Sequence, residues 1–270
     1  MTDELRFTIL GCGSSGGVPR LGKTAGGDWG ACDPANPKNA RRRCSMLVER
    51  ETANGVTRVL IDTSPDMRMQ LLDAGVGHLD AVVWTHAHAD HVHGLDDLRM
   101  IVFNTRRRLA VWADGDTQND LFARFGYAFV QPADSPYPPI LEMHTITDTF
   151  SIDGRGGPIT LTPFKVNHGT IDALGFRIAD LAYLPDVAAI PDNVWPLLEN
   201  LDCWVLDALR YAPHPTHAHV AQALDWIDRA NPRRAVLTNM HVDLDYARLD
   251  AETPDNVTPA HDGLVIRYPL

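Results

Sequence analysis

Short apolar runs alternate with amphipathic stretches along most of this 270-residue chain. Apolar runs bounded by turn residues are typical of strands, and apolar positions recurring every three or four residues are typical of helices. The predicted strands are Arg6–Leu10, Arg58–Asp62, Leu79–Thr85, Leu109–Ala113, Ile159–Asn167, Gly175–Ala179, Leu181–Leu184, Cys203–Asp207, Arg234–Asn239 and Leu264–Tyr268. The predicted helices are Pro65–Ala74, Thr117–Phe125, Asp192–Leu198, His219–Ala230 and Leu244–Leu249. Strands that alternate with helices, together with strands in adjacent pairs, predict an α/β sandwich with mixed sheets.

The pattern shows no internal repeat and no Ser/Gly linker, so we predict one domain over residues 1–270. A chain of this length, with 44% hydrophobic residues, can bury a full core. One long segment, at about residues 13–43, is rich in glycine and proline. Loops of that length are usually functional or disordered, which makes this loop a candidate part of a site.

Charge and apolar patterning narrow the class of partner. No apolar run reaches the roughly 20 residues that span a bilayer, and the N-terminus lacks a signal-peptide pattern, so we expect a cytoplasmic protein without a membrane partner. The net charge of −11 disfavours a polynucleotide partner and suits bound cations. Two arginine runs, Arg41–Arg43 and Arg106–Arg108, are either solvated faces or phosphate-facing patches. The four cysteines form no CxxC pair, so we expect buried free thiols.

The chemistry is concentrated in one motif, Thr85-His86-Ala87-His88-Ala89-Asp90-His91, which follows an apolar strand. Ligands in α/β proteins lie at the carboxyl ends of strands. Strand alternation places His86 and His88 on one side, while Asp90 and His91 turn away as the chain bends. This arrangement divides the four side chains between two neighbouring ions. Imidazole and carboxylate together suit zinc, manganese or iron better than magnesium or calcium.

The motif His-x-His-x-Asp-His after an apolar strand resembles the hallmark of the metallo-β-lactamase superfamily. The resemblance implies a four-layer αββα sandwich of two mixed sheets and two divalent metal ions, zinc or manganese. It implies that Asp62, at a strand end, orients a ligand histidine. By role it implies that His86, His88 and His168 hold the first ion, that Asp90 and His91 hold the second, and that Asp186 bridges both.

The last ligand of the second ion departs from the superfamily pattern. Members usually read Leu-Thr-His, whereas this chain reads Leu237-Thr238-Asn239. His241 lies two residues further on, where strand alternation could aim it the same way. Either His241 completes the second site, with Asn239 nearby, or that site binds its metal weakly. We take His241 as the ligand.

Further stretches resemble the branch of the phosphoribosyl 1,2-cyclic phosphate phosphodiesterases, which is similar to tRNase Z. They are Gly11–Pro19, Asn36–Ser45, His214–His219 and Ala260–Leu264. The resemblance implies that His217 supplies the proton to the leaving group, and it adds Asp90 and Asp62 to the catalytic residues. Small residues in a glycine-rich loop let a phosphate approach backbone N–H groups. Ser14, Ser15, Arg43 and His217 are the candidate substrate-binding residues.

The sequence therefore predicts a metal-dependent hydrolase, a phosphodiesterase that cleaves a small cyclic or nucleotide-like phosphodiester through a hydroxide bridging two ions. Two alternatives stay open: a thioester or lactone hydrolase on the same fold, and a nucleotide-binding protein with an impaired second metal site. A homodimer is an implication of the resemblance alone.

Overall fold

The computed structural model describes residues 3–23, 25–131 and 133–270, so position 24 of the predicted loop at 13–43 lies outside it. The chain forms two compact units. The first contains the segment ending at Leu10, Ser45–Thr160 and Val265–Leu270, and the second contains Gly11–Cys44 and Leu161–Leu264. The prediction of one domain over 1–270 stays a prediction.

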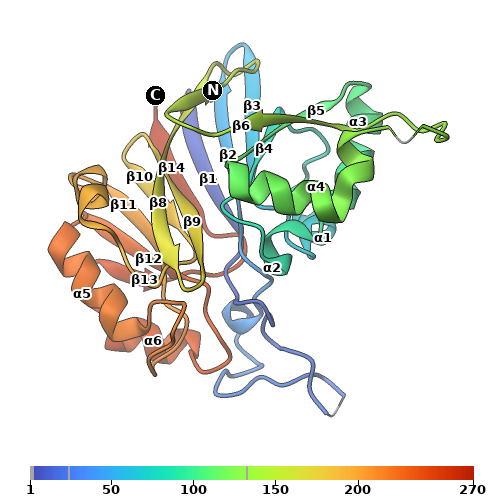
Figure 1. Ribbon diagram of the computed structural model, residues 1–270. Helices are drawn as coiled ribbons and strands as arrows, with labels where there is room; N and C mark the ends of the chain where they lie inside the picture. The colour runs from blue at the N-terminus through green and yellow to red at the C-terminus, as the bar shows by residue number, and fades with distance from the viewer. Residues whose placement is uncertain (1–2, 24, 132) are drawn as a thin grey trace. The chain divides into compact units, whose positions relative to one another are not determined.

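The first sheet has seven strands in the order β14-β1-β2-β3-β4-β5-β6 (Figure 1). Its strands are β1 Glu4–Gly11, β2 Ser45–Thr52, β3 Gly55–Ile61, β4 Ala81–Val83, β5 Leu109–Ala113, β6 Leu141–Thr145 and β14 Val265–Pro269. Its helices are α1 Met67–Asp73, α2 Ala89–Val92, α3 Leu98–Thr105 and α4 Gly115–Phe129, with a 3₁₀ turn at Leu95–Asp97. Neighbours from β3 to β6 run parallel, and β1 and β2 pair antiparallel with β14 and β3.

The second sheet also has seven strands, in the order β13-β12-β11-β10-β9-β8-β7. Its strands are β7 Phe150–Ile152, β8 Ile159–His168, β9 Ile171–Ile178, β10 Leu181–Leu184, β11 Cys203–Asp207, β12 Arg234–Thr238 and β13 Val257–Pro259. Helices α5 Val220–Ala230 and α6 Tyr246–Glu252 belong to this half of the fold, with 3₁₀ turns at Pro37–Asn39 and Asp192–Leu198. Strands β10 to β13 run parallel, and β8, β9 and β10 are antiparallel neighbours.

The central strands explain why the core forms where it does. Strands β4, β10 and β11 are buried at every position, as parallel strands covered on both faces must be. In the first unit, helices add their apolar faces to a cluster that includes Trp84, Val92 and Leu98. The predicted fold class, an α/β fold of the αββα type with two mixed sheets, is confirmed.

The cysteine side chains and the apolar character of the helices bear on two further predictions. All four cysteines, Cys12, Cys32, Cys44 and Cys203, are buried thiols outside any disulfide, as expected. Among the described residues, no helix combines the length and the apolar character that crossing a bilayer requires.

Candidate active site

The histidine motif in the first unit is arranged around a buried aspartate. Strands β3 and β4 are parallel, with Ile61 opposite Val83, so Asp62 and Thr85 follow at the same sheet edge. Asp62 is fully buried and accepts hydrogen bonds from the Thr85 backbone N–H and the Thr85 hydroxyl, both at 2.8 Å. Its backbone is left-handed, with φ 63°, a conformation that aspartate tolerates better than most residues. The hydrogen bonds from Thr85 therefore offset part of the cost of burying the Asp62 carboxylate.

Asp62 fixes the orientation of His91. The Asp62 Oδ2 atom lies 2.7 Å from Nδ1 of the fully buried His91. Burial raises the pKa of Asp62, and the hydrogen bonds from His91 and Thr85 oppose that rise. A proton on Nδ1 satisfies the carboxylate and leaves the Nε2 lone pair for a cation. That Nε2 atom lies 3.6 Å from Oδ2 of Asp90, so the two residues form one candidate ligand pair.

A second ligand pair in the same motif is fixed through Thr85. The Thr85 hydroxyl donates to Asp62, so it accepts from Nδ1 of His86, which is 3.0 Å away. This bond leaves the lone pair of His86 on Nε2, and that atom lies 3.0 Å from Nδ1 of His88. His88 caps the short helix α2 that carries Asp90 and His91. The motif therefore presents two pairs of donor atoms, and the binding of one ion by each pair stays a prediction.

In the second unit, three parallel strands end side by side and bring three polar residues together. Leu184 of β10 pairs with Leu206 of β11, and Asp207 pairs with Thr238 of β12. Asp186, Asp207 and Asn239 lie at or just beyond these carboxyl ends, and each is at most 2% exposed. The amide nitrogen of Asn239 lies 3.1 Å from Asp207 Oδ1 and 3.3 Å from Asp186 Oδ1.

Two histidines face these carboxylates. His168, the last residue of β8, donates from Nδ1 to the Thr216 carbonyl at 2.6 Å, which directs its Nε2 toward Asp186 Oδ1, 3.8 Å away. His217 places Nδ1 3.0 Å from Asp207 Oδ2 and 3.4 Å from Asp186 Oδ1. Among the described residues of this unit, His168, Asp186 and His217 form a group whose ligand atoms lie within 4.8 Å of one another.

Asp207 was not predicted from the sequence, although its environment marks it as functional. It is fully buried, and burial raises its pKa to about 6, opposed by the hydrogen bond from His217 and reinforced by the nearby charge of Asp186. Its place at the end of an apolar strand, between two strands that also end in polar residues, is the signal that could have identified it.

His241, the predicted last ligand, is held by other groups. Its Nε2 atom lies 3.0 Å from Arg20 Nη1, and its Nδ1 lies 3.2 Å from Asp243 Oδ1. Arg20 in turn pairs with Asp28 at 2.8 Å. The group formed by His168, Asp186 and His217 does not include His241, and its role as a metal ligand stays a prediction.

The glycine-rich loop reaches the same strand ends. Gly13 forms isolated β-bridges with Arg43 and with Met240, the residue after Asn239. A Cβ at Gly13 would lie 3.0 Å from the backbone oxygen of Arg41, so the close approach of these segments requires glycine. Ser14 is buried and its N–H donates to the Met240 carbonyl at 3.3 Å, whereas Ser15 is exposed. Their role in substrate binding, like that of Arg43, stays a prediction.

Several side chains of the two arginine runs bind other parts of the protein and do not simply extend into solvent. Arg41 is only 2% exposed and donates to the Leu244 carbonyl at 2.7 Å and to Asn39 Oδ1 at 3.1 Å, so it fastens the loop internally. Arg108 donates to the Leu141 carbonyl, and Arg107 pairs with Asp80 at 3.2 Å.

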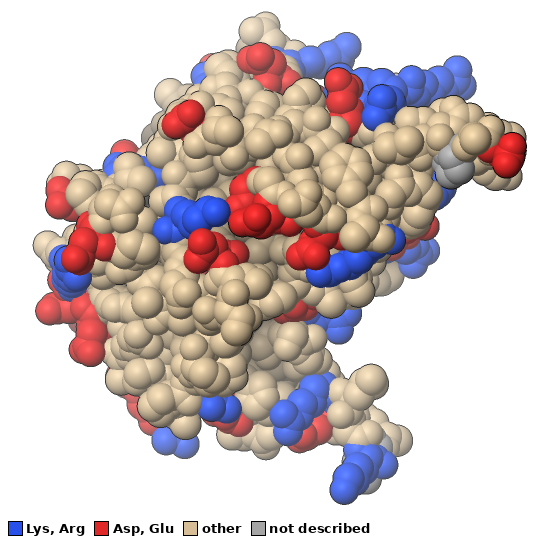
Figure 2. Space-filling view, in the orientation of Figure 1, with Lys and Arg blue, Asp and Glu red and all other residues tan. Residues whose placement is uncertain are grey.

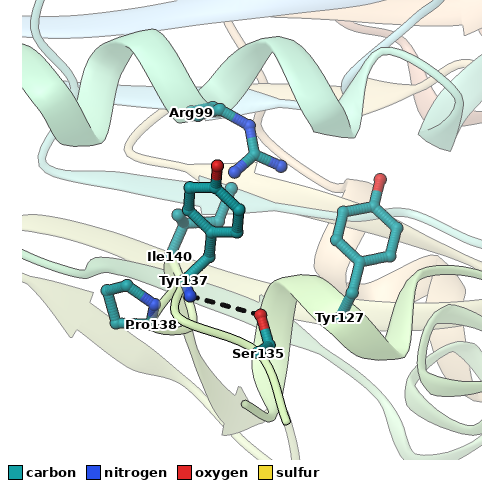
Figure 3. Close-up of a pocket in the computed structure, with 6 residues that line it drawn as sticks. All are labelled: Arg99, Tyr127, Ser135, Tyr137, Pro138 and Ile140. Carbon is teal, nitrogen blue, oxygen red and sulfur yellow. Dashed lines mark hydrogen bonds between the residues drawn. The ribbon is translucent and has the colours of Figure 1, made fainter. Parts of the chain in front are cut away.

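A separate pocket of about 120 Å³ lies in the first unit (Figure 3). Its lining residues are Arg99, Tyr127, Ser135, Tyr137, Pro138 and Ile140. Arg99 and Tyr127 both bind Asp96, at 3.0 and 2.9 Å. None of the predicted ligands lines this pocket, so it is not the candidate site.

The donor chemistry fits divalent metal ions. His86, His91 and His168 each engage Nδ1 with an oxygen of the protein and direct Nε2 toward another donor atom. Ligand histidines in metalloproteins are oriented by such bonds from the second nitrogen. Together with carboxylates, this set suits zinc or manganese.

Comparison with known proteins identifies the class. The chain belongs to the metallo-β-lactamase superfamily: the model described as "Beta-lactamase superfamily domain" matches residues 57–240. The resemblance to that superfamily inferred from the motifs is thus confirmed.

Particular relatives add detail. The chain is similar to the crystal structure of a new diphosphatase from the PhnP family, with 33% sequence identity and a TM-score of 0.86. The alignment covers 100% of this chain and 99% of the diphosphatase chain. An octanoyltransferase of Porphyromonas gingivalis is 33% identical over 265 residues, 96% of this chain and 51% of that protein. A ribonuclease Z of a Bradyrhizobium strain is 28% identical over 166 residues, 58% of this chain and 52% of that protein. The chain spans about half the length of these two curated relatives.

Proposed function

We propose that this chain is a metal-dependent phosphodiesterase that hydrolyses a small cyclic or nucleotide-like phosphodiester. The observation that carries the proposal is the pairing of the half-buried His217 with the buried Asp207 beside Asp186, because it supplies a proton donor next to ligand-type groups. The similarity over the full length to a diphosphatase supports the substrate class. The similarity of part of the chain to a ribonuclease Z supports phosphodiester chemistry in general.

The ions are proposed to bind the residues given by the sequence resemblance. They are His86, His88, Asp90, His91, His168, Asp186 and His241. Divalent ions at such ligands polarise phosphoryl oxygens and lower the pKa of water. The chain's own residues then have two tasks: to hold the ligand imidazoles in one tautomer and to deliver a proton.

The proton is proposed to come from His217. Water attacks phosphorus and gives up one proton to solvent as the new bond from its oxygen to phosphorus forms. The bond from phosphorus to the leaving oxygen breaks, and its electron pair stays on that oxygen. The Nε2–H of His217 protonates this oxygen, while the Nδ1–H of His217 keeps its hydrogen bond to Asp207. Proton transfer from a positioned side chain contributes about 10²–10⁴ in rate, most for leaving groups of high pKa.

A small substrate agrees with the charge of the molecule. The net charge is −11, and Lys and Arg side chains are scattered among Asp and Glu over the face shown in Figure 2. Long polyanions are bound through many clustered cationic contacts. We therefore propose a small phosphodiester rather than a polynucleotide. The cytoplasmic location and the homodimer stay predictions.

Hydrolysis of a thioester or lactone is the second candidate, favoured by the octanoyltransferase name of one relative, of which this chain covers 51%. A thiolate leaves without protonation, so thioester hydrolysis has no need of His217. The two candidates therefore differ in what His217 does.

Replacing His217 with alanine tests the proposal. With an unactivated alkyl phosphodiester we expect kcat to fall about 10²-fold or more, and with bis-p-nitrophenyl phosphate, whose leaving group needs no proton, we expect little change. Steady-state kinetics on both substrates, with metal content measured in each protein, give the comparison. Equal losses on both substrates, or loss of metal from the variant, would count against His217 as the acid. Turnover of thioesters alone would replace the proposal with the second candidate.

A further inference from the structure

Position 239, where the superfamily usually has a ligand histidine, holds an asparagine whose side chain is fixed on every side. Asn239 is 1% exposed and follows β12 with φ 60°, a left-handed conformation that asparagine adopts readily. Its Oδ1 atom lies 4.0 Å from the thiol sulfur of Cys44, and its Nδ2 faces the carboxylates of Asp186 and Asp207. The thiol donor on one side and the acceptors on the other assign the orientation of the amide.

The hydrogens of the Asn239 amide are fully used. An amide nitrogen carries two hydrogens, and two carboxylate oxygens lie within 3.3 Å, Asp207 Oδ1 and Asp186 Oδ1. The third neighbour, His217 Nδ1 at 3.1 Å, already donates its proton to Asp207 and cannot accept another. Asn239 therefore donates to both carboxylates at once. A histidine at this position would offer at most one donor here.

The carboxylate of Asp207 is consequently held at both oxygens. Its Oδ1 accepts from Asn239, and its Oδ2 accepts from His217 and from the Val187 N–H at 3.1 Å. With both oxygens engaged, the carboxylate has one orientation, and that orientation sets the plane of the His217 ring. In a buried site, each of these bonds is strengthened by the low polarity of its surroundings.

We propose that Asn239 is a positioning residue for His217: by donating to Asp207 and Asp186 together, it clamps the Asp207 carboxylate so that the imidazole of His217 points its Nε2–H at the leaving oxygen. This role rests on the proposed function. Asn239 acts through Asp207 and contributes no metal ligand. At this position the chain therefore has, in place of the superfamily's usual ligand histidine, a residue that orders the proton donor.

The test is Asn239→Ala, with Asn231→Ala as its matched control. Asn231 is also left-handed, with φ 49°, but its side chain is exposed at the end of α5. For Asn239→Ala we expect about a tenfold fall in kcat on an unactivated alkyl phosphodiester, an unchanged KM, and less than about a twofold change on bis-p-nitrophenyl phosphate. Metal content should stay equal to that of the parent. For Asn231→Ala we expect neither rate to change.

A double-mutant cycle with His217→Ala makes the test specific. If Asn239 acts only through His217, its replacement has no further effect once His217 is gone. Equal losses on both substrates, loss of metal from Asn239→Ala, or additive losses in the double variant would each overturn the positioning role.

A spectroscopic readout separates this inference from the proposed function. In metal-free protein, the Nδ1–H of His217 bonded to Asp207 should give a low-field proton resonance, assigned by its loss in His217→Ala. We expect that resonance to weaken or shift in Asn239→Ala and to stay in Asn231→Ala. An unchanged resonance would overturn the clamp. Failure of the parent protein to hydrolyse either phosphodiester would refute the proposed function, and the resonance would still decide whether Asn239 positions His217.

Discussion

The tautomers of the candidate ligand histidines are determined by the groups that bind Nδ1. Asp62 holds His91, the Thr85 hydroxyl holds His86, and the Thr216 carbonyl holds His168. Each bond leaves Nε2 as the nitrogen that can donate a lone pair to a cation. Metal affinity should therefore depend on residues that bind no metal.

Asp62→Asn tests this dependence for His91. The amide has the shape of the carboxylate, and asparagine tolerates the left-handed backbone at this position, but its NH₂ cannot accept from His91. His91 would then move its proton to Nε2, and we expect metal affinity to fall about 10–100-fold. Competition with a chelator, followed by metal analysis, measures the change.

Asp80→Asn is the matched control. Asp80 is also a largely buried aspartate of the first unit, but its carboxylate accepts from the Arg58 N–H and pairs with Arg107. Its replacement should leave metal affinity unchanged. Equal affinity in the parent and in Asp62→Asn would contradict the orienting role.

Residues with a distinctive spacing could be predicted, and residues defined by packing could not. The motif from His86 to His91 is contiguous, so its ligand character is visible in the sequence. Asp207 has no neighbouring polar motif and becomes notable only because β10 and β12 lie on either side of its strand. The partners of His241, Arg20 and Asp243, depend on where the long loop folds back, which periodicity does not reveal.

At the scale of elements, strands with continuous apolar runs were predicted most accurately. Leu109–Ala113, Leu181–Leu184 and Cys203–Asp207 have the predicted bounds. Strand β2 was not predicted because its second half, Glu49-Arg50-Glu51-Thr52, is polar. Pairing with β3 stabilises this segment as a strand although its local sequence does not favour one. Helix α3 was missed because Leu98–Thr105 contains β-branched residues and lacks a side-chain cap, and it is held by burial of its apolar side.

The pairing of β8 with β9 positions His168 and can be tested at Gly175. A Cβ at Gly175 would lie 2.2 Å from Cε2 of Phe164 on the neighbouring strand, so Gly175→Ala overpacks the sheet. We expect the free energy of unfolding to fall by about 1–3 kcal/mol. Thermal and denaturant unfolding measure it.

Gly126→Ala is the opposite case, because this glycine lies within α4 and a Cβ there would meet nothing within 4 Å. We expect it to raise the free energy of unfolding by about 0.4–1 kcal/mol. A Gly175→Ala protein as stable as its parent would show that β8 and β9 do not pack as described.

At the scale of the whole molecule, the two units each supply a buried aspartate that orients a histidine. In the first unit Asp62 orients a candidate ligand, and in the second Asp207 orients the proposed acid. The chain belongs to the metallo-β-lactamase superfamily, and we propose that it is a metal-dependent hydrolase of a small phosphodiester. The negative net charge is consistent with a site that binds cations.

The most direct test of this account measures metal content and phosphodiester hydrolysis on the same sample. Protein prepared with zinc or manganese should bind two ions per chain and hydrolyse bis-p-nitrophenyl phosphate. Chelation should abolish both, and adding either metal back should restore both together. Fully loaded protein that hydrolyses no phosphodiester, or hydrolysis that survives removal of the metal, would contradict it.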